Sequence, residues 1–137
     1  MKKIEDSNNK LYGNYAVLFV GFEKDNHDKL IDTVKNYNNS MKILFAKSED
    51  TEKSLKDVFS QENLYGYNNE SLSTKAVIMS GFKENEIVSF MKLIRSLGFD
   101  KNLWAVLTPT SKDWSLTDLL KELEEESKAV KKLRNTR

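Results

Sequence analysis

The chain has 137 residues, a formal net charge of +1 at pH 7 and no cysteine. This length suits one domain, and the near-zero net charge gives no electrostatic reason to expect nucleic acid or a membrane surface as a partner. The lack of cysteine excludes disulfides, a thiolate nucleophile and cysteine-ligated metals. The first residues lack the apolar core of a signal peptide and no apolar run reaches the ~20 residues of a membrane span, so we expect a cytoplasmic protein.

A flexible lead-in is predicted for residues 1–14, which are mostly polar and contain turn-forming Asn and Gly. A first strand is predicted for residues 15–20, which are apolar throughout. Such a strand is typical of a parallel sheet that is covered on both faces. Helices are therefore expected to cover it.

Helical spacing follows the first strand. Asp25 is predicted to cap the start of this helix, and Asn38-Asn39 is predicted to end it in the left-handed conformation. The apolar stripe of the helix has members at i, i+1, i+4 and i+7, namely Leu30, Ile31, Val34 and Tyr37.

A second strand and a second helix complete the first half of the chain, residues 15–60. The strand is predicted over residues 41–46. Ser54, with Asp57 three residues later, has the spacing of a capping box and opens the helix. The first half is therefore predicted to be β-α-β-α.

A connection between two halves is predicted for residues 61–74, which hold turn formers and no apolar period. Its three large side chains, those of Leu64, Tyr65 and Tyr67, are expected to anchor it to the surface of the domain.

The second half, residues 75–127, shows the same plan with stronger signals. A strand is predicted over residues 75–80, followed by a helix that Asn85 is expected to cap and Gly98 to end. Its apolar stripe consists of Ile87, Phe90, Met91, Ile94 and Leu97.

A fourth strand, residues 103–107, and a final helix complete the second half. Ser115 and Asp118 repeat the capping-box spacing of Ser54 and Asp57 at the start of that helix. Residues 128–137 are predicted to form its charged C-terminal end, either as a solvated helix or as a tail that binds a partner.

The two halves indicate a duplicated unit, because similar features recur about 60 residues apart. We predict a single α/β domain of two tandem β-α-β-α repeats, with a four-stranded, mainly parallel sheet and helices on both faces. Strand order 2-1-3-4 is favoured over the alternative order 1-2-4-3. The favoured order predicts that the turns Gly21-Phe22 and Gly81-Phe82 lie side by side, at the switch point where α/β sheets form a crevice.

These two turns have a second interpretation, in which they serve the fold alone. Gly21 and Gly81 would supply the positive φ that a tight turn needs, and Phe22 and Phe82 would fill the ends of the core. One glycine per turn also falls short of the glycine-rich motifs that cradle nucleotide phosphates.

The loop after the fourth strand is another candidate site, because it places hydroxyls and charges near a helix N-terminus, which attracts anions. Its candidate residues are Thr108, Thr110, Lys112, Asp113 and Trp114. In the alternative interpretation, Pro109 shapes the turn, Trp114 packs on the helix that it precedes, and the hydroxyls cap backbone groups.

Residues 76–126 resemble the bacterial family known as domain of unknown function 3783. The resemblance rests on the apolar strand before Ser80-Gly81-Phe82, the second strand ending at Thr108, and Trp114 followed by leucines and acidic residues. Members of that family often carry Asn where this chain has Ser111. Residues 16–60 resemble the family only through the internal repeat. The resemblance implies a small bacterial cytoplasmic module with no assigned activity.

No catalytic set is predicted. His27 is the only histidine, is expected to be exposed in the first turn of a charged helix, and has no cysteine or second histidine as a partner in a metal or nucleophile site. We expect no metal and no cofactor. The leading hypothesis is a non-catalytic interaction or regulatory module, with a protein partner or a homodimer formed through an uncovered sheet edge or helix face. The alternative is a small anionic ligand, a nucleotide or phosphate, bound at the switch point; an enzyme is the least favoured class.

Overall fold

The computed structural model describes residues 9–69, 72–99 and 101–135. Its four strands are β1 (Ala16–Val20), β2 (Lys42–Phe45), β3 (Ala76–Ser80) and β4 (Leu103–Val106). Its α-helices are α1 (His27–Tyr37), α2 (Leu55–Phe59), α3 (Glu84–Ser96) and α4 (Leu116–Asn135). Short 3₁₀ turns precede three of these helices, namely η2 (Lys24–Asn26), η3 (Ser48–Asp50) and η4 (Ser111–Asp113). The predicted order of elements, β-α-β-α twice, is confirmed.

The strands form one sheet in the order β2-β1-β3-β4, which confirms the favoured order and excludes 1-2-4-3. β1 is parallel to β2 and β3 is parallel to β4, whereas the central pair, β1 and β3, is antiparallel. The antiparallel register pairs Leu18 with Ile78, two residues that stand 60 positions apart. The two halves, each with a parallel pair of strands, therefore meet at the centre of the sheet with their strands running in opposite directions.

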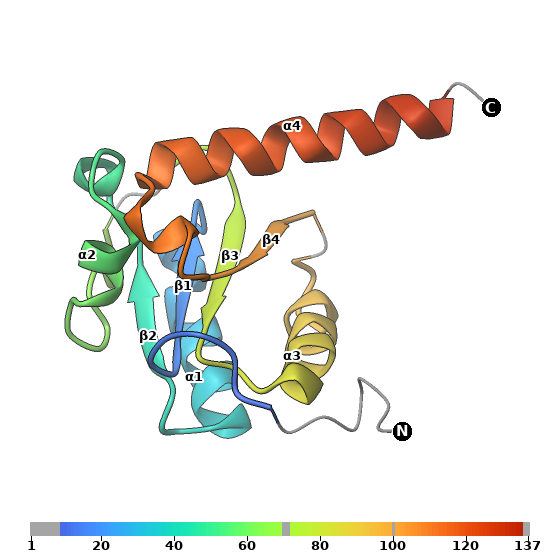
Figure 1. Ribbon diagram of the computed structural model, residues 1–137. Helices are drawn as coiled ribbons and strands as arrows, with labels where there is room; N and C mark the ends of the chain where they lie inside the picture. Colours follow the sequence, from blue (N-terminus) through green and yellow to red (C-terminus); the bar gives the residue numbers. More distant parts are fainter. Residues whose placement is uncertain (1–8, 70–71, 100, 136–137) are drawn as a thin grey trace.

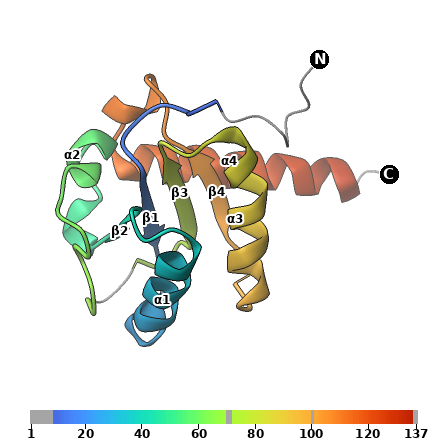
Figure 2. The same ribbon diagram turned by 90° about the horizontal axis from the view of Figure 1, so that it is seen from below.

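Helices cover both faces of the sheet, as predicted. Alternate strand residues point to opposite faces, so Leu18 and Ile78 pack with α2 and α4, while Val17 and Met79 pack with α1 and α3. Figure 1 shows α4 across one face and α1 and α3 on the other, and Figure 2 shows the same layers from below.

Two of the predicted helix caps are confirmed. The Ser54 hydroxyl accepts a hydrogen bond from the Asp57 N–H at 3.2 Å, and the Ser115 hydroxyl accepts one from the Asp118 N–H at 3.1 Å. Gly98 takes the predicted left-handed conformation after α3, with φ +98°. The spacing of residues in the sequence was sufficient to predict these caps, because each cap involves residues within one helical turn.

Three other predicted caps are wrong. Asp25 lies inside η2, and Asn26 occupies the N-cap of α1 instead. Asn85 lies within α3, whose N-cap is Lys83; the Glu86 carboxylate accepts from the Lys83 N–H at 2.9 Å and performs the capping. Asn38 ends α1 in an extended conformation, with φ −162°. The start of α1 differs from the prediction because the 3₁₀ turn η2 precedes it, and the start of α3 differs because Glu86 caps it from within the helix.

Residues 9–14 form a strap that lies along the turn after β3. The Leu11 N–H donates to the Phe82 carbonyl at 2.8 Å, and the Gly81 N–H donates to the Tyr12 carbonyl at 2.8 Å. This part of the predicted lead-in is thus hydrogen-bonded to the domain. The rest of it, residues 1–8, lies outside the described residues, so its flexibility stays a prediction.

The two edges of the sheet differ. Along β2, the connection between the halves supplies backbone partners: the Leu64 N–H donates to the Ile43 carbonyl at 2.7 Å, and the Phe45 N–H donates to the Tyr65 carbonyl at 2.8 Å. The predicted anchoring role of the connection is confirmed, since Tyr67 also donates to the Asp28 carboxylate at 2.6 Å. At the other edge, all four residues of β4 remain partly exposed.

Helices α2 and α4 begin side by side but differ greatly in length. The Leu55 N–H donates to the Trp114 carbonyl and the Leu116 N–H donates to the Lys53 carbonyl, at 2.9 and 3.1 Å. From this shared start α2 runs for 5 residues and α4 for 20, so that α4 extends past β4 in Figure 1. Within the described part of the chain, no helix is long and apolar enough to cross a membrane.

Candidate functional site

The two Gly-Phe turns lie at opposite ends of the sheet, which overturns the prediction that they lie side by side. Because β1 and β3 are antiparallel, Ala16 at the start of β1 pairs with Ser80 at the end of β3. Gly21 follows the far end of β1. No common crevice can therefore form above both turns, and the switch-point site loses its geometric basis.

Close packing explains both glycines. A Cβ on Gly21 would collide with the backbone of Thr74, and one on Gly81 would lie 2.6 Å from the Asn14 carbonyl carbon. Both residues also have positive φ, +78° and +68°. Each Gly-Phe turn is thus held against the segment that leads into the neighbouring strand.

The two phenylalanines are core residues. Phe22 is 2% exposed and Phe82 is fully buried. Phe22 packs edge-on against Phe19 and Phe82 packs edge-on against Phe90, with ring centroids 5.4 and 5.1 Å apart. These contacts support the structural interpretation of both turns, since a buried ring has no surface left for a ligand.

The loop after β4 is organised by its own hydrogen bonds. Ser111 is buried, with 7% of its surface exposed, and its hydroxyl accepts from the Thr108 N–H at 3.0 Å. The Thr108 hydroxyl in turn accepts from the Ser111 N–H at 3.0 Å. Trp114 packs against the core at the start of α4. Thr110 is exposed on the outside of the loop. The hydroxyls of Thr108 and Ser111 therefore serve the turn, in line with the alternative interpretation of this loop.

In the corresponding loop after β2, a carboxylate in place of hydroxyls accepts the hydrogen bonds that stabilise the loop. Asp50, whose side chain is fully buried, accepts from the Lys47 N–H at 2.7 Å, from Lys53 Nζ at 2.9 Å and from the Tyr65 hydroxyl at 2.7 Å. Burial alone would raise the pKa of Asp50, but these hydrogen bonds outweigh it and hold the pKa below its usual value. Asp50 is thus a structural anion that ties the connection to the loop.

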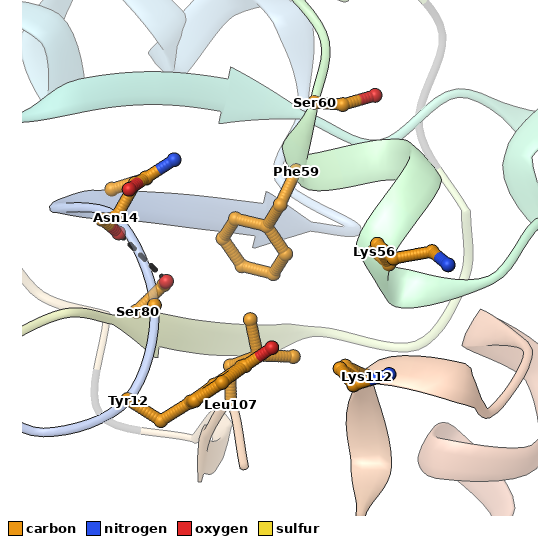
Figure 3. A pocket seen from close by; sticks show the side chains of 10 residues that line it. Tyr12, Asn14, Lys56, Phe59, Ser60, Ser80, Leu107 and Lys112 are labelled. Carbon is orange, nitrogen blue, oxygen red and sulfur yellow. Dashed lines mark hydrogen bonds between the residues drawn. The ribbon is translucent and has the colours of Figure 1, made fainter. Parts of the chain in front are cut away.

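One of the candidate residues, Lys112, lines a pocket of about 480 Å³. Lys112 lines it together with Ser80, the neighbour of Gly81. The pocket lies at the carboxyl ends of β3 and β4, between the end of α2 and the strap, and Figure 3 shows it from close by. Sequence reasoning did not single out the other lining residues, namely Tyr12, Gly13, Asn14, Ala16, Lys56, Phe59, Ser60, Ser80 and Leu107.

These residues lie far apart in the sequence and meet only in the folded protein, so sequence patterns could not group them. Tyr12 belongs to the strap, Lys56 and Phe59 to α2, and Leu107 to the end of β4. Taken singly, each has an ordinary place in a sequence pattern: Phe59 lies in the apolar stripe of α2 and Lys56 on its polar face. The only signal available beforehand was the short length of the segment between Ser54 and the turn formers of the connection.

The charges at the pocket are those of two lysines. Lys112 Nζ is paired with the adjacent carboxylate of Asp113, at 2.9 Å, and Asp113 is itself largely exposed. Lys56 extends into solvent from α2. No carboxylate, imidazole or thiol lines the pocket among the described residues, so its chemistry is that of ammonium groups, hydroxyls and an apolar wall.

His27 is buried, which overturns its expected exposure. It is 2% exposed and stacks on Phe45 with ring centroids 3.9 Å apart. Its Nε2 lies 3.1 Å from the Phe22 carbonyl, and its Nδ1 accepts from the Asn68 N–H at 2.9 Å. Asn68 is 41 residues away, so only the folded connection could reveal this contact. Among the described residues, no group of three or more His, Cys, Asp or Glu side chains is placed to hold a metal ion.

The fold and the pocket define a single-domain α/β protein with a mixed four-stranded sheet and helices on both faces. Residues 75–130 match the family described as Domain of unknown function (DUF3783), which confirms the resemblance predicted for this half of the chain. Comparisons with curated proteins and with solved structures found no match. Of the pocket, Ser80, Leu107 and Lys112 lie within the matched residues.

Proposed function

We propose that this protein is a non-catalytic interaction module that pairs with a second copy of itself through the outer edge of β4. The observation that carries the proposal is the difference between the two sheet edges. The connection covers β2, whereas β4 is apolar along its whole length and open.

The backbone of β4 offers unused hydrogen-bonding groups. Leu103 and Leu107 donate inward, to the carbonyls of Lys75 and Met79 at 2.9 and 2.8 Å. Because the direction of the N–H groups alternates along a strand, those of Trp104 and Val106 point outward. Within the described part of the chain, neither of these outward groups has a hydrogen-bond partner. An unpaired edge of this kind is a template for another strand.

The side chains around this edge also favour association. Edge strands are commonly protected by charges, proline or a bulge. β4, with sequence Leu-Trp-Ala-Val, contains neither charge nor proline. The neighbouring helix α3 places the Arg95 guanidinium 5.7 Å from the Trp104 ring, and Val88, two turns earlier on the same side of this helix, is 54% exposed. Apolar surface thus accompanies the open backbone.

The partner that best fits the open edge of β4 is a second copy of this chain. Two β4 strands can pair antiparallel about a two-fold axis, which makes the contact self-complementary and closes it after two chains. The same kind of pairing already joins β1 to β3 inside the domain. A small-ligand function is the second candidate, because the pocket lies at the carboxyl ends of two parallel strands, where α/β sheets often bind ligands.

Sedimentation across a concentration series tests the proposal, with Val106→Pro as the main variant. Because the Val106 N–H points outward, proline removes no bond within the sheet but blocks pairing across the edge. We expect the wild type to form dimers and Val106→Pro to raise the dimer dissociation constant by about tenfold or more. A wild type that remains monomeric at ~1 mM would overturn the proposal.

A second variant separates pairing from misfolding. Val88→Glu places a charge beside the edge without touching a strand, and Asn36→Glu adds the same charge on the exposed surface of α1. Val88→Glu should weaken the dimer and Asn36→Glu should leave it unchanged, with equal circular dichroism for both. Equal dimer affinity for these two variants would show that another surface mediates association.

A further inference from the structure

The pocket between α2 and the strap exists because α2 is short. Phe59 is the last residue of this 5-residue helix, and the chain then turns away through Ser60. The sheet surface near Ala16 and Ser80 is therefore left without a helix above it. A pocket of about 480 Å³ remains, which lies within the range of roughly 300–1,000 Å³ that is usual for small-molecule sites.

One side of the pocket is an apolar wall. The Phe59 ring lies at its centre in Figure 3, with Leu107 and the Tyr12 ring opposite. Phe59 and Leu107 are 8% and 5% exposed, so the core holds both in place, while Tyr12 is 41% exposed at the mouth. This wall suits the apolar body of a small molecule.

The two serine hydroxyls of the pocket are already committed as donors. Ser80 Oγ donates to the Asn14 carbonyl at 2.7 Å, and Ser60 Oγ donates to the Asp57 carbonyl at 2.6 Å. An anion in the pocket would meet their lone pairs and not their protons. Positive charge for the recognition of an anion therefore comes from the ammonium groups of Lys56 and Lys112, and the Tyr12 hydroxyl at the mouth is a further potential donor.

The charges near the mouth favour a single negative charge. Lys56 and Lys112 lie on one side of the pocket in Figure 3. Asp113, just outside the lining, neutralises part of this charge through its pair with Lys112. Two lysines and one carboxylate leave one positive charge, which matches one carboxylate better than a dianionic phosphate. We propose that the pocket binds a small organic acid with one carboxylate and an apolar body, with the carboxylate at Lys56 and Lys112 and the body against Phe59 and Leu107.

A titration followed by amide chemical shifts tests the pocket, with phenylacetate and hexanoate as probes. We expect saturable shifts at Tyr12, Phe59, Leu107 and Lys112, and weaker binding of the neutral phenylacetamide. Phenyl phosphate and inorganic phosphate form separate arms of the titration. Phosphates that bind more tightly than the carboxylates, or an amide that binds as tightly as phenylacetate, would overturn the assignment of a carboxylate.

A charge-removing variant tests the lysines. Lys56→Gln should raise the dissociation constant of phenylacetate by about two- to fivefold, the effect of losing one exposed ion pair. Lys92→Gln is the matched control, because it removes the same charge from the exposed surface of α3. If both variants change affinity equally, or if no probe gives saturable shifts at these residues in the wild type, the proposal fails. A monomeric or dimeric wild type can be titrated in the same way, so this result is independent of the β4 edge.

Discussion

The imidazole of His27 is held between two backbone groups and an aromatic ring. Its Nδ1 accepts from the Asn68 N–H, so the proton of the neutral ring belongs on Nε2, where it donates to the Phe22 carbonyl. Protonation of Nδ1 would place a second donor against the Asn68 N–H. Burial lowers the pKa of His27 below its ordinary value of 6.5, although the bond to Phe22 and the nearby Asp28 partly oppose this.

Acid is therefore expected to destabilise the protein through His27. Since the unfolded chain binds this proton more readily than the folded chain, stability contributed by the neutral ring is full above pH 6.5 and is lost as pH falls toward the lower folded pKa. Urea unfolding at pH 7.5 and at pH 5.5 should show a lower free energy of unfolding at the lower pH.

The chain offers a clear control, because His27 is its only histidine. In His27→Phe, which keeps a ring to stack on Phe45, the loss of stability between these pH values should become smaller than in the wild type. An unchanged pH dependence in this variant would assign the effect to other groups.

The turn between β3 and α3 joins two elements through a residue that tolerates no side chain. Gly81 needs positive φ, and a Cβ on it would lie 2.6 Å from the Asn14 carbonyl carbon in the strap. Gly98, after α3, also has positive φ, but a Cβ there would meet nothing within 4 Å. A side chain at Gly98 would therefore cause backbone strain alone, whereas a side chain at Gly81 would cause both backbone strain and a steric collision.

Alanine at the two glycines should have different costs. Gly98→Ala is expected to destabilise the protein by about 1–2 kcal/mol, the cost of left-handed backbone in an L-residue. Gly81→Ala should cost at least about 1 kcal/mol more, because the strap must also move. Urea unfolding of both variants measures the difference, and equal losses would show that the strap yields without cost.

Across the whole molecule, the sheet is closed at one edge and open at the other. We expect the outward amides of Trp104 and Val106 to exchange with solvent at least about 100-fold faster than the inward amides of Leu103 and Leu107 in dilute protein. At the covered edge, the amides of Ile43 and Phe45 should be protected, since Ile43 donates to Asn63 Oδ1 at 2.8 Å and Phe45 to Tyr65.

Hydrogen exchange measured by NMR at two protein concentrations checks this prediction. Protection of Trp104 and Val106 that grows with concentration would support pairing of β4 between copies. Full protection of both amides in dilute protein would instead mean that a segment of the same chain covers this edge.

Local signals were sufficient for the elements and their order. Apolar runs located all four strands, helical spacing located the helices, and serine with aspartate three residues later located the caps at Ser54 and Ser115. Strand order 2-1-3-4 followed from joining two similar halves through their first strands, and the structure confirms it. The duplicated origin of the halves stays a prediction.

The candidate site was less accessible to such reasoning. Lys112 was predicted and lines the pocket, but Lys56 and Phe59 were not, because a helix pattern does not show what lies beyond the end of the helix. Thr108 proved to be a turn residue, and Phe22 and Phe82 proved to be core residues. The presence of hydroxyl and charged residues in a loop does not show whether the hydroxyls bind a ligand or form the hydrogen bonds that stabilise the loop.

The sequence alone determined where the chain forms strands and helices, because apolar periodicity and capping act over a few residues. Only the tertiary structure decided the antiparallel direction of β1 against β3, since strand direction depends on contacts between residues as distant as Leu18 and Ile78. That one choice sends the two Gly-Phe turns to opposite ends of the sheet. It also packs each glycine against the segment that leads into the neighbouring strand.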